Sequence, residues 1–212
     1  MAVTPDTRAG LQAAEDKWRS RWPEWELIET FIPSEQRTLA WAWFAWLDEL
    51  AMAAWSGSEP APGMAKLAWW QEELRGWAKG ARRHPLGIAL QPLKVDWSGI
   101  ADEMGALRAH DAGRAGQIDA LSQSLEGFAQ KVAEAEQQVL GGTTVVPQTR
   151  LLRSMLVTAG VPLTAKTGVG ARNGARARRL LDNACDLRVG AQGRSIGRLV
   201  LLWSSWRAAR NG

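Results

Sequence analysis

The sequence contains 212 residues, 46% of them hydrophobic, and its formal net charge is +4. This is enough apolar content to bury one substantial core, so we expect a single domain over residues 1–212. No apolar run approaches the roughly 18 residues that span a bilayer, and residues 1–21 lack the apolar centre of a secretory signal. The single cysteine, Cys185, excludes an internal disulfide and fits a reducing cytoplasm. The chain has only two histidines, His84 and His110, so we do not expect a catalytic thiol or a zinc site.

The hydrophobic pattern predicts an all-α protein, because no alternation of β-branched residues is long enough for a strand. Polar loops with glycine and proline are expected at residues 56–63 and 80–84, and residues 164–174 are expected to be the most flexible internal segment. We interpret His84, directly before a proline, as a helix boundary and not as a ligand. The predicted helices, in chain order, cover residues 6–21, 34–55, 63–78, 98–112, 118–140, 147–159, 175–187 and 195–210.

Four motifs follow one another in the first half of the chain: Pro33-Ser-Glu-Gln-Arg37, Trp41-Ala-Trp-Phe44-Ala45, Lys66-Leu-Ala-Trp-Trp-Gln-Glu-Glu-Leu74 and His84-Pro85. Their content and order resemble the squalene/phytoene synthase family, which joins isoprenyl diphosphates head to head. In that family a Pro-x-x-x-Arg segment opens a helix with the motif Tyr/Phe-Ala-x-x-Arg-x-x-Asp-Asp-x-x-Asp, and a second helix reads Lys-Leu-x-Trp-Trp-x-x-Glu-Leu. The resemblance covers residues 15–95 well. It implies an isoprenoid synthase-like helical bundle, shortened at its C-terminal side.

The residues that carry the family's chemistry are replaced in this sequence. In an alignment without gaps, the family's phosphate-binding arginine falls on Asp48, which would repel a phosphate. The three aspartates of its first metal motif fall on Ala51, Met52 and Trp55. Mg²⁺ prefers oxygen ligands, and these three side chains offer none. The resemblance therefore implies a non-catalytic member that needs no cofactor.

In an alternative interpretation the protein is an active enzyme, an Mg²⁺-dependent prenyl transferase that condenses two allylic diphosphates. Its metal ligands would be Asp48 and Glu49 on one helix and the pair Asp182 and Asp186 on another. The first pair requires an insertion or deletion within a helix. The second is the only Asp-x-x-x-Asp spacing in the chain, which places both carboxylates on one helical face. We expect these two acids to form a solvated face among the neighbouring arginines.

Tryptophan is concentrated in the two motif helices, where seven of the thirteen Trp residues lie between Trp41 and Trp77. Trp supplies a large apolar area, which suits either the packing of a core or the lining of a cavity for an isoprenoid chain. We therefore expect the protein to bind an isoprenoid or lipid, or a protein partner, similar to family members that assist assembly of respiratory complex I. The candidate cavity residues are Trp41, Phe44, Met52, Trp55, Trp69 and Trp70.

Apolar residues in the middle of the chain repeat at alternating three- and four-residue steps, as in a heptad pattern. The repeat is short for a coiled-coil dimer, so we expect one long helix over residues 118–140, packed within the bundle. Its apolar positions are Ile118, Leu121, Leu125, Phe128, Val132, Ala135 and Val139.

Positive charge is concentrated in the last third of the chain. Residues 1–149 contain 14 Lys or Arg and 20 Asp or Glu, whereas residues 150–212 contain 12 Lys or Arg and two Asp. In the final predicted helix, a basic amphipathic pattern is typical of helices that lie on an anionic membrane surface. The alternative is that the apolar stripe closes the bundle and leaves the arginines in solvent. The stripe contains Ile196, Leu199, Val200, Trp203 and Trp206, beside Arg194, Arg198, Arg207 and Arg210.

Nucleic-acid binding is disfavoured for this basic segment, because no recognised nucleic-acid-binding module is present. A third function remains beside the two above, an interaction module whose arginine-rich segment docks on anionic lipid or nucleic acid. We expect a cytoplasmic protein, with peripheral contact at the inner face of a membrane as an alternative.

Overall fold

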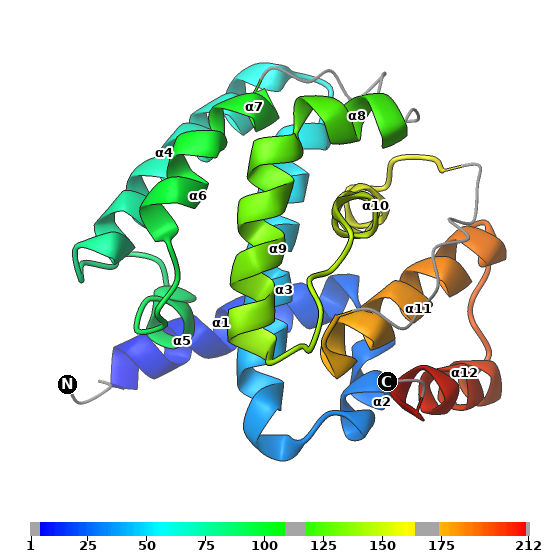
Figure 1. The fold of residues 1–212 in the computed structure, drawn as a ribbon. Coiled ribbons are helices and arrows are strands. Elements are labelled where there is room, and N and C mark those ends of the chain that lie inside the picture. The colour runs from blue at the N-terminus through cyan, green and yellow to red at the C-terminus, as the bar shows by residue number, and fades with distance from the viewer. Residues whose placement is uncertain (1–4, 109–117, 164–173, 211–212) are drawn as a thin grey trace.

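The computed structural model describes residues 5–108, 118–163 and 174–210, and these form helices joined by turns and loops (Figure 1). About 75% of the described residues are helical, and these residues contain no strand. The prediction of an all-α protein is confirmed. The isoprenoid synthase-like arrangement of the helices stays a prediction.

The central element is α3 (Ser34–Trp55), which has the bounds expected from the sequence. It follows α1 (Pro5–Arg21), α2 (Trp25–Ile28) and the short 3₁₀ helix η1 (Glu29–Phe31), of which only α1 was expected. α3 packs against α1, α4, α5, α9 and α10. Because neighbours cover it on all sides, every residue from 40 to 51 is buried, which explains its continuous run of apolar and small side chains.

Helix α4 (Pro60–Ala78) lies beside α3 and begins three residues earlier than expected. Proline is favoured in the first turn of a helix, where its missing N–H is not needed, so Pro60 starts the helix where a loop was predicted. Gly63 allows the close approach of the two helices, since a Cβ there would lie 2.2 Å from the carbonyl oxygen of Ala53.

After α5 (Gly87–Leu90), the helix expected at 98–112 is divided into α6 (Trp97–Glu103) and α7 (Gly105–Arg108). The division falls before Gly105, a residue of low helix propensity. The end of the predicted range, residues 109–112, lies outside the described residues.

The single helix predicted for residues 118–140 is wrong. The structure has α8 (Ile118–Ser124) and α9 (Glu126–Leu140), separated at Leu125, whose φ of −108° and ψ of 15° depart from helical values. α8 contacts α10, and α9 contacts α3, α6 and α10. The apolar pattern survives the break, because its positions within the described side chains, Leu121, Leu125, Phe128, Val132, Ala135 and Val139, are buried.

The last third of the chain forms α10 (Gln148–Thr158), α11 (Arg176–Ala191) and α12 (Arg198–Arg210). α11 extends four residues beyond its predicted end, and α12 begins three residues after its predicted start. α12 packs on α11, α2 and η1 (Figure 1). The segment expected to be flexible, residues 164–174, lies outside the described residues except for Gly174.

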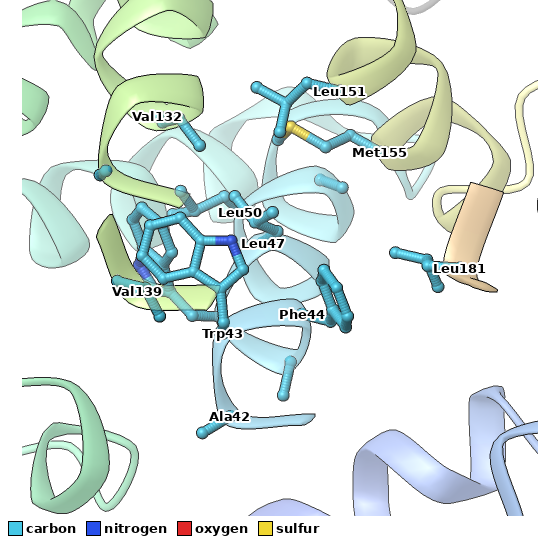
Figure 2. Packing of buried hydrophobic residues seen from close by; sticks show 14 of the residues in the cluster. Ala42, Trp43, Phe44, Leu47, Leu50, Val132, Val139, Leu151, Met155 and Leu181 are labelled. Carbon is cyan, nitrogen blue, oxygen red and sulfur yellow. The ribbon is translucent and has the colours of Figure 1, made fainter. Parts of the chain in front are cut away.

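Tryptophan rings and aliphatic side chains share the core. The ring centroids of Trp43 and Trp46 lie 4.9 Å apart in a tilted pair, and those of Trp77 and Trp97 lie 4.9 Å apart in an edge-to-face pair. Figure 2 shows Trp43 on the side of α3 that faces α9, and Phe44 on the side that faces Leu181 of α11. The core therefore surrounds α3 instead of lying on one side of it.

Candidate functional site

The two acids of α3 that could begin a metal motif lie against cations from two other helices. Asp48 and Glu49 are only 2% and 7% exposed. Arg21 of α1 donates to Asp48, and Lys66 of α4 donates to Glu49. Lys17 of α1 lies 2.7 Å from the other carboxylate oxygen of Glu49. We call these five residues the α3 acid cluster.

The cations decide the protonation of Glu49. Burial alone would raise the pKa of this carboxyl, but the hydrogen bonds and charges of Lys17 and Lys66 outweigh burial and lower the pKa to about 2. Glu49 is therefore ionised at neutral pH. The cluster holds three cations and two carboxylates. Its formal charge is therefore positive and favours the binding of an anion over the binding of a further cation.

Two clefts adjoin the α3 acid cluster, and Lys17, Arg21 and Glu49 border both. One has a volume of about 230 Å³ and extends towards His84 and Pro85. The other has a volume of about 510 Å³ and lies between Lys66 and the loop that precedes α4. The sequence motifs at residues 66–74 and 84–85 therefore come together around α3, as their order in the chain suggested.

His84 has the structural role that the sequence indicated. Its backbone N–H donates to Glu73 at 2.8 Å, and its Nδ1 accepts from the backbone N–H of Leu86 at 3.2 Å, directly before α5. Burial lowers the pKa of His84, against the opposing charges of Glu49 and Glu73. A neutral imidazole fits the acceptor role of Nδ1, so His84 fixes the turn into α5.

The three positions of the family's first metal motif do not form a metal site. Ala51 is buried, Met52 borders the 510 Å³ cleft, and Trp55 is buried in the core. None carries a side-chain oxygen for Mg²⁺. The neighbouring acids, Asp48 and Glu49, are already paired with cations. In the described part of the chain, no three His, Cys, Asp or Glu side chains gather into a potential metal site.

The second candidate acid pair, on α11, is also paired with arginines. Arg150 of α10 donates to Asp182, and Arg178 lies 3.6 Å from it. Arg153 lies 2.7 Å from Asp186. Burial raises the pKa of Asp182 to about 6, although Arg178 and Arg150 oppose the rise, so the group is ionised at neutral pH. The expectation of a solvated face is wrong for Asp182, which is only 8% exposed.

A buried charge network that the sequence did not reveal lies next to Asp182. Arg178 donates from Nε to Glu136 of α9 at 2.7 Å and from Nη1 to Ser154 at 2.8 Å. Trp43 donates its indole N–H to the same carboxylate at 2.9 Å. One signal was present in the sequence, because Glu136 stands four residues after Val132 and three before Val139, on the apolar face of α9.

Of the six candidate cavity residues, none shares a described cleft or space with another. Trp41, Phe44, Trp55 and Trp70 are buried, whereas Met52 and Trp69 are partly exposed. Phe44 borders a space of about 10 Å³ between α1, α3, α10 and α11, which has room for about one water molecule. Trp70 stacks on His84 with ring centroids 4.6 Å apart. These side chains pack against the protein itself, and the space beside Phe44 is too small for an isoprenoid chain.

Helix α12 turns its apolar stripe outward. Leu199, Val200, Trp203 and Trp206 are 82%, 54%, 60% and 44% exposed. The helix packs on the bundle through its other side, where Leu201, Ser205 and Ala208 are buried. The alternative in which the stripe closes the bundle is therefore wrong. The candidate arginines Arg194, Arg198, Arg207 and Arg210 are exposed, as expected.

The arginine-rich segment 150–212 is not an exposed basic tail as a whole. Arg150, Arg153, Arg178 and Arg179 are buried in contacts between helices. Arg179, for example, donates to the carbonyl oxygen of Gly174 at 2.9 Å. Among the described residues of this segment, the exposed arginines are Arg194, Arg198, Arg207 and Arg210, in and before α12, and Arg176 at the start of α11.

None of the helices in the described residues is long and apolar enough to cross a membrane. Comparison of the chain with protein-family models, curated proteins and solved structures found no match. The resemblance to the squalene/phytoene synthase family therefore rests on the sequence motifs and stays a prediction.

Proposed function

We propose that the protein is a non-catalytic member of the squalene/phytoene synthase superfamily and acts by binding a lipid or a protein partner. One observation carries the proposal: every carboxylate that could replace the lost metal motifs is paired with a cation of the same chain. The pairs are Asp48 with Arg21, Glu49 with Lys17 and Lys66, Asp182 with Arg150, and Asp186 with Arg153.

These pairs oppose Mg²⁺ binding for a physical reason. Prenyl transfer of this type uses Mg²⁺ to stabilise the charge that develops on the leaving diphosphate. A carboxylate that binds the metal must first release its arginine or lysine. That cation would then lie beside a divalent ion in a partly buried site, where repulsion is screened less than in water. The paired state is therefore favoured over the metal-bound state.

Packing of the core supports the same conclusion. A head-to-head condensation needs space for two isoprenoid chains, whereas the space beside Phe44 has a volume of about 10 Å³. Met52, one of the candidate cavity residues, borders the open 510 Å³ cleft instead. Among the spaces described, the open cleft beside Met52 therefore suits a ligand better than the small space beside Phe44.

The test is an activity assay with the purified full-length protein, Mg²⁺ and farnesyl or geranylgeranyl diphosphate. We expect no condensed hydrocarbon or presqualene-type product above a control without protein. Product that disappears in both Asp48→Asn and Asp182→Asn would instead establish the Mg²⁺-dependent prenyl transferase. Circular dichroism of both variants checks that they keep their helical content, since each change alters a buried ion pair.

A further inference from the structure

Helix α12 carries apolar and cationic side chains on the same exposed face. Leu199, Trp203, Trp206 and Arg210 follow four-, three- and four-residue steps, which align them along one side of a helix. All four are exposed. Leu201 and Ala208 lie on the opposite side and are buried against the bundle. The fold therefore holds α12 in place and leaves this face uncovered.

The arginines of this face lie on the tryptophan rings. The guanidinium of Arg207 is 4.7 Å from the ring centroid of Trp203, and that of Arg210 is 4.5 Å from the ring centroid of Trp206. These are cation–π contacts. The positive charges are therefore placed at the apolar surface itself. A partner that covers the tryptophans must also accept the arginines.

Charge distribution identifies the partner as anionic. No Asp or Glu follows Asp186 in the sequence, whereas Arg188, Arg194, Arg198, Arg207 and Arg210 do. Residues 1–149 contain six more acidic than basic residues. An anionic surface would attract α12 and repel residues 1–149 on average, which orients the molecule with α12 towards that surface.

We propose that α12 lies flat on an anionic membrane surface, with Leu199, Trp203 and Trp206 at the boundary between headgroups and acyl chains. Arg207 and Arg210 contact lipid phosphates from the same face. Tryptophan is favoured at this depth, because one part of its ring is apolar and its N–H is polar. Interfacial helices combine such an apolar face with basic residues. This inference rests on the proposed function, a protein that acts by binding, and specifies the partner.

Two other occupants fit the observations less well. A second copy of the chain docked through the same face would bring α12 against α12, and each of these helices presents arginines and no acidic side chain of its own. An acidic protein surface would need carboxylates at fixed positions matching Arg207 and Arg210. Anionic lipids move laterally and can collect under these arginines wherever the helix lands.

The experiment is cosedimentation of the full-length protein with vesicles, without Mg²⁺ or isoprenoid diphosphates. Vesicles of phosphatidylcholine alone are compared with vesicles that also contain phosphatidylglycerol, at low and at high salt. We expect binding only to the anionic vesicles. We also expect it to weaken at high salt, since the Debye length falls from about 10 Å at 0.1 M to about 3 Å at 1 M.

Variants separate the charge from the apolar contact. The double variant Arg207→Gln/Arg210→Gln should lower the partition coefficient roughly 30-fold, about fivefold for each arginine. The control, Lys79→Gln/Lys94→Gln, removes the same charge from exposed positions outside α12 and should change binding little. The variant Leu199→Ser/Trp203→Ser should lower binding roughly tenfold or more at both salt concentrations, through lost apolar insertion. Brominated lipids should quench the fluorescence of the wild-type protein more than that of this variant.

Three results would overturn the inference. The first is no binding to anionic vesicles. In that case, analytical ultracentrifugation of the wild-type protein and Trp203→Ser identifies the occupant. A wild-type dimer that Trp203→Ser converts to a monomer indicates a second copy of the chain, and a wild-type monomer leaves an acidic protein as the occupant. The second is binding that both double variants of α12 retain. The third is binding that depends on the arginines but not on Leu199 and Trp203, which indicates adsorption without insertion. Each of these results leaves the activity assay unaffected, so the failure of this inference is distinguishable from that of the proposed function.

Discussion

Arg178 and Glu136 form an ion pair inside the protein, with side chains that are 0% and 2% exposed. The Nε of Arg178 donates a hydrogen bond of 2.7 Å to Oε1 of Glu136. Burial alone would lower the pKa of Arg178, but Glu136 and then Asp182 outweigh burial and hold it above its ordinary value. The pair joins α11 to α9, and Trp43 adds α3 through its indole N–H.

Removal of one charge from this pair should strongly destabilise the fold. Glu136→Gln leaves Arg178 buried without its carboxylate, a change that typically costs about 3–5 kcal/mol. The free energy of unfolding is measured by urea titration. Glu134→Gln on the same helix is the control, because Glu134 is partly exposed, and should change the value by less than about 0.5 kcal/mol. Equal effects of the two substitutions would show that the pair does not stabilise the fold.

Trp69 and Trp70 provide a second matched comparison, because they are adjacent but differ in burial. Trp70 is fully buried between Trp77 and His84, so Trp70→Ala should cost about 3–5 kcal/mol. Trp69 is partly exposed, and Trp69→Ala should cost about 1–2 kcal/mol. The free energy of unfolding of both variants is to be measured by chemical denaturation. A larger loss for Trp69→Ala would contradict the packing described for α4.

Glu49 should make the stability of the protein depend on pH in the acid range. Its pKa is lowered from 4.5 to about 2 in the folded protein, so its ionised form stabilises the fold. This contribution is complete above about pH 4.5 and is lost as the pH falls from 4.5 towards 2. Because Lys17 and Lys66 are partly in solvent, we expect roughly 1–2 kcal/mol. The measurement is the free energy of unfolding as a function of pH.

Glu49→Gln is the variant that isolates this effect, since it cannot titrate. It should be less stable than the wild-type protein at neutral pH, and the difference should shrink between about pH 4.5 and 2. Glu72→Gln on α4 is the control, because its side chain is 71% exposed. A constant difference between Glu49→Gln and wild type over this pH range would refute the role given to Lys17 and Lys66.

Polar substitutions on the two faces of α12 should differ in their effect on the stability of the fold. Leu201 is 3% exposed, and Trp203 is 60% exposed. Leu201→Ser should cost about 2–5 kcal/mol, the range for truncation of a buried leucine. Trp203→Ser should change the melting temperature little, because this side chain contacts water in the isolated protein. Strong destabilisation by Trp203→Ser would place the stripe inside the bundle after all.

Elements with strong local signals could be predicted from the sequence. The bounds of α3 follow from Pro33 before its first residue and a polar loop after Trp55. The break at Leu125 could not be predicted, because no glycine or proline occupies that position and the apolar pattern continues through it. The break is visible only in the folded chain, where α8 and α9 both pack on α10.

In the candidate site, too, features that depend on residue type could be predicted, whereas contacts between helices could not. The sequence could identify the missing oxygens at Ala51 and Met52, because these depend only on residue type. It could not identify the partners of Glu49, since Lys17 and Lys66 come from different helices. Nor could it decide which side of α12 faces the bundle, because both sides carry apolar residues.

The acids of α3 and α11 are paired with the protein's own cations, and the proposed function requires that they do not hold Mg²⁺. Isothermal titration of the purified protein with Mg²⁺, together with a non-reactive farnesyl diphosphate analogue, tests it most directly. The account predicts no saturable heat that depends on Mg²⁺, in the wild-type protein and in Asp48→Asn/Asp182→Asn alike. Stoichiometric Mg²⁺ binding by the wild-type protein, lost in that double variant, would contradict it.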